Sequence, residues 1–273
     1  MPSANIWHLH PLHRHQMNTV RLILALSITA LLLMALPSPA QQRFQRWGGG
    51  VDDEPLHFGF SFHYINADYK ITLKPDWQTP DLTASAADTV PLLGVSSPFY
   101  HGVGLGLLAD VKLTENANLR FTPSLVFSNK AVHYRYANTT DNNYTNTTDV
   151  TEKLIRASYI DLPLLFKFKS DRKGNYRGYL IGGGKYSINV VSGKRYDDAQ
   201  LVPSEKYLKT KPGYFSYEAG IGFDLYFDFF KMSPEIRWVQ SIGNLLDSRE
   251  PNMYNRPIDR LMLRNLQISL FFE

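Results

Sequence analysis

Residues 214–227, "YFSYEAGIGFDLYF", are the clearest indication of the fold, because large apolar residues alternate with small or acidic ones along them. Phe215 and Phe223 carry odd numbers, whereas Glu218 and Asp224 carry even ones. A period of two places the two sets on opposite faces of an extended strand. The two acids are six residues apart, about 20 Å along a strand. They are too far apart to act on one bond, so we expect two separate salt bridges to inward Arg or Lys residues.

The same period recurs in eight segments of the chain, which predicts eight strands with one apolar and one polar face. The predicted strands are about 9 to 15 residues long, which exceeds the usual ~5–6 and reaches the ~9–11 that cross a bilayer at a tilt. The segments are residues 56–66, 102–113, 119–128, 160–168, 176–189, 214–227, 232–240 and 265–272.

The links between these segments alternate in length. Long links at residues 67–100, 137–152, 190–213 and 241–260 take turns with short ones at 114–117, 170–175 and 228–231. This pattern is typical of outer-membrane barrels, with short periplasmic turns and long external loops. Lipid offers no hydrogen bonds to a free sheet edge, so a spanning sheet must close. A soluble periplasmic β-sandwich also alternates and is the competing interpretation.

We therefore predict an all-β fold over residues 56–273: an eight-stranded antiparallel transmembrane β-barrel of the outer-membrane type, connected as an up-and-down meander. The even strand number places both ends of the mature chain in the periplasm. Residues 138–149 ("NTTDNNYTNTTD") are polar and low in complexity, and we expect them to form an external surface loop.

The N-terminal region predicts export. Residues 17–40 combine Arg21, the apolar run "LILALSITALLLMAL" and small residues before Gln41, which is the pattern of a secretory signal peptide. A signal anchor is the alternative. Residues 1–16 are interpreted as an over-extended start, and residues 41–55 as a periplasmic N-terminal segment. No later segment is long and apolar enough for a helical span. The export signal and the predicted barrel together indicate an integral protein of the bacterial outer membrane.

Composition excludes several classes of function. The chain has 29 Lys plus Arg against 25 Asp plus Glu, a balance that does not favour nucleic acid as a partner. Cysteine is absent, which excludes disulfides, thiolate metal sites and cysteine nucleophiles. The glycine cluster in "LIGGGKYS", residues 180–187, lacks the spacing of a phosphate-binding loop. We predict no cofactor and no metal site.

The polar faces of the predicted strands collect both signs of charge. An eight-stranded barrel is only wide enough for its own side chains, and isolated buried ions are costly. We therefore expect these charges to pair as a structural network that fixes the strand register. A path for a polar small molecule or ion is the functional alternative. The predicted network consists of Asp110, Lys112, Arg120, Asp161, Lys167, Arg177, Lys185, Glu218, Asp224, Glu235 and Arg237.

A barrel hydrolase was considered and is not expected. His57 and His63 would point inward, and Ser61 and Ser128 share the polar face. A serine hydrolase needs its serine and histidine within hydrogen-bond reach and a third group to orient the ring. Nothing in the spacing selects such a set, so we predict no enzymatic activity and no catalytic residues.

Several segments resemble the PorT family of outer-membrane barrels from the Bacteroidota. The most specific is "YEAGIGFDLYFDFFKMSPEIRWVQSIGNLL", residues 217–246. The other matching pieces are "FGFSFHYINADYKI", "YIDLPLLFKFKS", "YLIGGGKYS" and the closing "NRPIDRLMLRNLQISLFFE". The resemblance implies a non-enzymatic accessory component of the type IX secretion system, also linked to gliding motility.

Three partners are expected. The barrel pattern predicts outer-membrane lipid, and the alternation of the C-terminal strand "LQISLFFE", with its aromatic residues, predicts recognition by the barrel-insertion machinery. The resemblance implies other secretion-system proteins. We expect Phe230 and Lys231, in the third periplasmic turn, to contact a periplasmic partner. The alternative function is a small outer-membrane barrel that binds or passes a small ligand.

Overall fold

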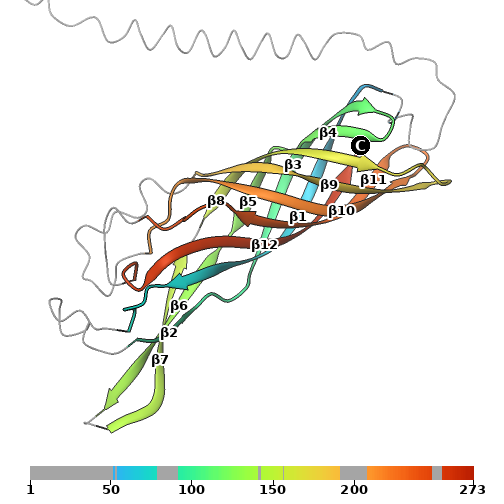
Figure 1. Ribbon diagram of the computed structural model, residues 1–273. Coiled ribbons are helices and arrows are strands. Elements are labelled where there is room, and N and C mark those ends of the chain that lie inside the picture. The colour runs from blue at the N-terminus through green and yellow to red at the C-terminus, as the bar shows by residue number, and fades with distance from the viewer. Residues whose placement is uncertain are drawn as a thin grey trace, which may run out of the picture. The chain divides into compact units, whose positions relative to one another are not determined.

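A computed structural model describes residue 52 and residues 54–78, 92–140, 143–155, 157–190, 208–247 and 254–273 (Figure 1). The predicted over-extended start, residues 1–16, and the predicted signal peptide, residues 17–40, lie outside the described residues. So does the predicted periplasmic segment, residues 41–55, apart from Asp52, Glu54 and Pro55. Among the described residues, no helix is long and apolar enough to cross a membrane.

The described residues form β-strands belonging to one compact unit, Gln45–Glu273. The strands are β1 (Leu56–Leu73), β2 (Leu92–Ser96), β3 (Tyr100–Thr114), β4 (Ala117–Phe121), β5 (Ser124–Ser128), β6 (Lys130–Thr140), β7 (Asn143–Ile155), β8 (Ser158–Lys169), β9 (Tyr176–Asn189), β10 (Gly213–Tyr226), β11 (Lys231–Ser241) and β12 (Ile258–Phe272).

The main sheet closes on itself. Its strand order is β1-β12-β11-β10-β9-β8-β4-β3-β5, with additional pairings of β1 with β3 and of β8 with β5. Because β4 and β5 both lie between β3 and β8, they form two halves of one barrel strand. The ring therefore has eight positions, and each neighbouring pair is antiparallel. The predicted eight-stranded meander is confirmed, and a sandwich with free edges is excluded.

The interruption between β4 and β5 has a local cause. Pro123 has no N–H to give to the ladder, whereas its carbonyl still accepts a hydrogen bond of 2.9 Å from the Leu107 amide. The faces continue through the break: Arg120, Thr122 and Ser124 are all buried. The barrel strand thus loses a rung of hydrogen bonds but keeps its inward register.

The two faces of the ring have opposite chemistry. On the outer face, Phe58, Leu107 and Phe223 expose 69%, 67% and 53% of their surface, whereas inward-pointing Asp110 and Asp224 expose 0%. A soluble protein rarely leaves so continuous an apolar face in water. Apolar residues outside a closed barrel and polar residues inside it are what a bilayer requires.

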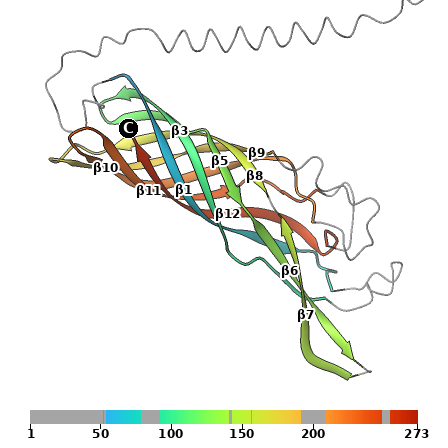
Figure 2. The ribbon, with the colours of Figure 1, turned by 180° about the vertical axis from the view of Figure 1, so that it is seen from behind.

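The two ends of the barrel differ (Figure 1). The short-turn end is defined here by the turns at residues 115–116, 170–175 and 227–230, together with the start of β1 and the end of β12. Figure 1 and Figure 2 both show the β6–β7 hairpin projecting from the opposite, long-link end, away from the C-terminus.

The expected surface loop at residues 138–149 was wrong. The described backbone there belongs to β6 and β7, which pair from Lys130↔Ile155 to Thr140↔Asn143 and form a second sheet in the order β2-β6-β7. The Thr-rich composition favours strands, but the segment lacks the apolar alternation that would have predicted one. The links at 67–100 and 241–260 are likewise shorter than predicted, because β1 runs to Leu73 and β12 starts at Ile258.

An apolar core packs the base of the β6–β7 hairpin against β12. Val132 and Tyr134 of β6 are fully buried and belong to one cluster with Ile258 and Leu261 of β12. The Tyr134 hydroxyl donates a 2.8 Å hydrogen bond to the Tyr254 carbonyl oxygen. The long-link end is therefore a packed structure, and the base of the hairpin is part of it.

Candidate functional site: the charged interior of the barrel

Nine of the eleven predicted network residues are buried inside the barrel, and two are half-buried at its short-turn end. The half-buried residues are Lys112 and Arg177. The buried residues are Asp110, Arg120, Asp161, Lys167, Lys185, Glu218, Asp224, Glu235 and Arg237.

In the half of the barrel nearer the long-link end, charges of alternating sign form a chain. Lys185 Nζ lies 2.9 Å from a carboxylate oxygen of Asp161 and 2.9 Å from one of Glu218. Glu218 in turn accepts a 2.7 Å hydrogen bond from Arg237 Nη1. These residues belong to β8, β9, β10 and β11 in succession, so each bridge ties a barrel strand to its neighbour.

The chain continues toward the short-turn end. Arg237 Nε lies 2.7 Å from Glu235, and Glu235 lies 3.6 Å from Arg120 Nη1. Arg120 donates from Nε and Nη2 to one oxygen of Asp110, at 2.9 and 2.7 Å, while Asn118 donates to the other at 2.7 Å. Charge-assisted hydrogen bonds of this length are among the stronger ones in proteins.

Lys167 and Asp224 form a second pair. The Lys167 ammonium lies 2.7 and 2.9 Å from the two oxygens of Asp224 and 3.9 Å from the centre of the Tyr179 ring. Ser233 donates a further 2.6 Å hydrogen bond to Asp224. Glu218 and Asp224, six positions apart on β10, thus have different partners.

The structure corrects the expectation for Lys231. Its side chain exposes only 1% of its surface and points into the barrel, where Nζ lies 2.8 Å from a carboxylate oxygen of Glu273. With Asp52 and Glu273 in place, it is therefore not exposed on the surface of the barrel. Lys231 is the first residue of β11 rather than part of the turn.

Sequence reasoning missed Glu273, whose carboxylate turns into the barrel and also contacts Arg120 Nη2 at 3.2 Å. Lys130 and Lys169 are buried inward cations that were likewise missed. Alternation could have indicated all three residues. Lys169 and Glu273 continue the inward-facing positions of β8 and β12, and Lys130 continues those of β5. For Glu273 this position follows from buried Gln267, Ser269 and Phe271.

No alternation pattern could have indicated that Asp52 is part of the network, because Asp52 lies outside the strands. Its carboxylate lies 3.4 Å from Arg177 Nη1 and 3.6 Å from Lys231 Nζ, and it accepts a hydrogen bond from the Tyr226 hydroxyl. Burial acts to raise the pKa of Asp52, but Lys231, the Tyr226 hydroxyl and Arg177 together hold it below its usual range.

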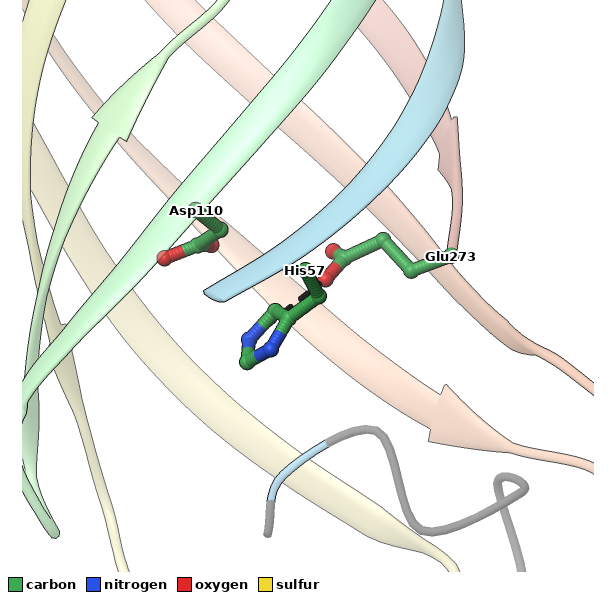
Figure 3. A group of neighbouring side chains, drawn as sticks. All are labelled: His57, Asp110 and Glu273. Atoms are coloured by element: carbon green, nitrogen blue, oxygen red, sulfur yellow. Dashed lines mark ion pairs between the residues drawn. The ribbon is translucent and has the colours of Figure 1, made fainter. Parts of the chain in front are cut away.

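One group at the short-turn end has the residue types of a metal site. His57 of β1, Asp110 of β3 and Glu273 after β12 bring one ligand atom each within 4.8 Å of one another (Figure 3). Both carboxylates already have cationic partners, however: Arg120 for Asp110, and Arg120 with Lys231 for Glu273. A divalent cation would have to displace them, so the group fits the ion-pair network better than a metal.

The histidine–serine pair considered for hydrolysis is present but enclosed. The Ser61 Oγ and His63 Nε2 atoms are 3.0 Å apart, and the other ring nitrogen contacts Ser269 Oγ at 2.9 Å and Gln267 Nε2 at 3.0 Å. The ring is thus oriented by a hydroxyl and an amide rather than by a carboxylate. Ser61 exposes 1% of its surface, so a substrate has no access without opening of the wall.

Aromatic residues gather outside the short-turn end. Phe227 and Phe230 stack at 4.8 Å between ring centres, and Phe230 lies 6.4 Å from Phe272. Phe229 exposes 83% of its surface. Such residues form the interfacial girdle of a membrane barrel. Phe230 is exposed there, and its contact with a partner stays a prediction.

A closed, eight-stranded antiparallel ring with an apolar exterior and an ion-paired interior defines a small membrane-spanning β-barrel. Residues 92–247 match the family described as outer membrane protein beta-barrel domain, which is more than half of the chain. The chain therefore belongs to that family, which agrees with an integral outer-membrane protein. A search of curated proteins finds no match.

Proposed function

We propose that this chain is a non-enzymatic outer-membrane barrel needed for type IX protein secretion, or for assembly of that system and the gliding motility linked to it. In this proposal a signal peptide at residues 17–40 directs export, and the C-terminal strand engages the barrel-insertion machinery. The protein then acts through contacts with other secretion-system proteins at the periplasmic rim and the external loops. Its support is the resemblance of residues 217–246 to PorT barrels, together with membership of the outer-membrane barrel family.

The ion-paired interior is the observation that carries the proposal of a contact role. Charges from β3, β4, β8, β9, β10 and β11 take one another as partners, and Tyr179 adds a 2.9 Å hydrogen bond to Glu235. A barrel interior filled with paired side chains supports a structural role for these residues rather than a path for solutes. The two rims and the β6–β7 hairpin remain as surfaces for partners.

We assign the short-turn end to the periplasm, because short turns face the periplasm in bacterial outer-membrane barrels. The absence of native cysteine allows a direct test. Val150 on β7 and Lys173 in a short turn are both exposed. On intact cells, a membrane-impermeant maleimide should label Val150→Cys and spare Lys173→Cys until the cells are lysed. The reverse pattern would overturn the orientation.

Because the Lys231 side chain is buried, the proposed contact surface at the periplasmic rim does not include it. Asp228, Phe229 and Phe230 are exposed at the tip of the third short turn. We therefore place the partner contact on Phe229 and Phe230 and assign Lys231 a role in holding the barrel interior together.

Gene deletion with an assay of type IX cargo at the cell surface tests the function. Loss of surface cargo, restored by the wild-type gene, is the expected result. Complementation with Phe229→Ser should restore barrel assembly but not full cargo export, with Leu93→Ser on the opposite end as a matched exposed control. Normal cargo in the deletion strain would refute the secretion role.

A further inference from the structure

The Asp52 carboxylate occupies a site built by the barrel itself. Arg177 belongs to β9, Tyr226 to β10 and Lys231 to β11, three neighbouring strands of the ring. Asp52 precedes β1 and is not part of the ring's strand pairing. The side chains that bind it are therefore positioned by the barrel, whereas the ligand arrives from a separate segment.

The same segment is also held from the other side of the ring. Lys112 of β3 donates from Nζ to the Asp52 carbonyl oxygen at 3.2 Å, and its amide donates to the Pro55 carbonyl oxygen at 2.9 Å. Lys112 Nζ additionally pairs with Glu115 at 2.9 Å. Asp52 therefore lies between β3 and the strands β9 to β11.

Positive charge exceeds negative charge around this carboxylate. Lys169 of β8 exposes only 5% of its surface and is one of the charges that lower the pKa of Asp52, although no ion pair or side-chain hydrogen bond joins its ammonium to the described residues. Lys231 divides its contacts between Asp52 and Glu273. Without Asp52, Arg177 would lose its carboxylate and Lys231 would keep only Glu273, while Lys169 still has no ion pair among the described residues. Uncompensated cations in a partly buried site are unfavourable. The site therefore favours an anion.

We propose that the short-turn end carries a binding site for a peptide carboxylate, formed by Lys169, Arg177, Tyr226 and Lys231 and occupied in cis by Asp52. An acidic segment of a partner protein binds there in place of Asp52. Guanidinium, ammonium and phenol donors around one carboxylate are the groups that recognise an Asp or Glu side chain. This extends the proposed function by naming the partner's chemistry at the rim, but carboxylate binding itself does not depend on a role in secretion.

Competition between the two ligands makes the site testable. A tethered ligand acts at an effective concentration of the order of millimolar, so Asp52 masks the site from a free peptide. Asp52→Asn removes the internal competitor without changing the shape of the side chain. The apparent affinity for an acidic peptide should then rise by about 10-fold or more.

The experiment uses the mature chain in lipid nanodiscs and a fluorescent peptide with the sequence of residues 45–55, "QRWGGGVDDEP". Fluorescence anisotropy gives its dissociation constant. We expect Asp52→Asn to bind this peptide about 10-fold more tightly than wild type. A peptide with its three acids changed to amides should not bind. Adding Lys169→Gln to Asp52→Asn should lose most of the gain, whereas Lys173→Gln, at an exposed position of the nearby turn, should keep it.

Lys169→Gln serves as the main site variant because its ammonium has no partner among the described residues, so the barrel should still fold. Heat-dependent migration in gel electrophoresis checks folding of each variant. Equal affinity of wild type and Asp52→Asn, or equal binding of the acidic and amide peptides, would overturn the site. Both results are independent of cargo secretion, so failure of one proposal does not imply failure of the other.

Discussion

The pair between Lys167 and Asp224 allows a quantitative test of the charged interior. Both side chains are fully buried, and the ammonium contacts both carboxylate oxygens at 2.7 and 2.9 Å. Lys167→Met removes the charge but keeps an unbranched chain of similar volume. Asp224 then retains the Ser233 hydroxyl at 2.6 Å as its hydrogen-bond donor. A buried carboxylate in that position has lost its contacting cation.

Removal of one partner from a buried ion pair costs about 3–5 kcal/mol, because the other charge stays buried without compensation. Replacing both partners with apolar residues is close to neutral or stabilising. In Lys167→Met/Asp224→Leu the Ser233 hydroxyl loses its acceptor, which costs about 1–3 kcal/mol. The double variant should therefore recover part of the lost stability, and the coupling between the two sites should be about 2 kcal/mol or more.

Urea unfolding of the barrel in lipid vesicles measures these differences. Outward-facing Trp238 exposes 45% of its surface to the surroundings of the barrel, so its fluorescence reports transfer out of lipid. With a slope of about 2 kcal/mol per M, Lys167→Met should lower the midpoint by about 2 M. Lys173→Met, exposed in a short turn, should stay within about 0.5 kcal/mol of wild type.

Two results would refute this reasoning. A Lys167→Met barrel within 1 kcal/mol of wild type, by the ~3–5 kcal/mol scale used above, would mean that Asp224 is not charged or not buried. Additive effects of the two substitutions would mean that the pair is not coupled.

Three further predictions follow from other parts of the molecule. In Gly222→Ala the new Cβ would lie 2.4 Å from the Tyr179 ring, so the free energy of unfolding should fall by about 1–3 kcal/mol. Gly182→Ala is the control, because the nearest contact of its new Cβ would be at 3.4 Å. Equal urea midpoints for the two variants would contradict crowding at Gly222. Because the pKa of Asp52 is lowered from 3.8 in the folded chain, its stabilising contribution is present above that value and is lost as the pH falls through the folded pKa. The unfolding difference between wild type and Asp52→Asn should therefore persist from pH 7 to pH 5 and shrink below pH 3.8; a difference that vanishes by pH 5 would argue against the contact. Deleting residues 138–149 from the β6–β7 hairpin should leave folding of the eight-stranded ring unchanged in the gel-shift assay, since the ring's pairings use none of these residues; loss of the folded band would show that the hairpin is needed for assembly.

Much of the barrel can be predicted from the alternation of side chains along each strand. In a strand, successive side chains point to opposite faces, so alternation predicts the eight strands of the ring and their lipid-facing and inward residues. Alternation also applies to Lys231 and Glu273, which continue the inward faces of β11 and β12. The sequence-based interpretation failed at Lys231 because it assigned the residue to the turn, although the strand begins there.

The β6–β7 hairpin is a part of the fold that alternation does not predict. Residues 138–149 are polar at every position except Tyr144, so the sequence distinguishes no apolar face and indicates no strand. Their pairing is decided by continuation from β5 and β8, which enter the hairpin already side by side. Burial of Val132 and Tyr134 against β12 supports its base.

The inward-facing residues can be read from the amino-acid order, because their direction depends only on the two-residue period of an extended chain. Which charges meet depends on the closed barrel. Arg120 and Glu273 are 153 positions apart, and Lys167 and Asp224 are 57 apart, and their contact depends on ring closure and on the stagger between strands. The same holds for Asp52, which precedes the first strand and obeys no strand period. Its place among Arg177, Tyr226 and Lys231 exists only once the barrel has brought three strands together around it.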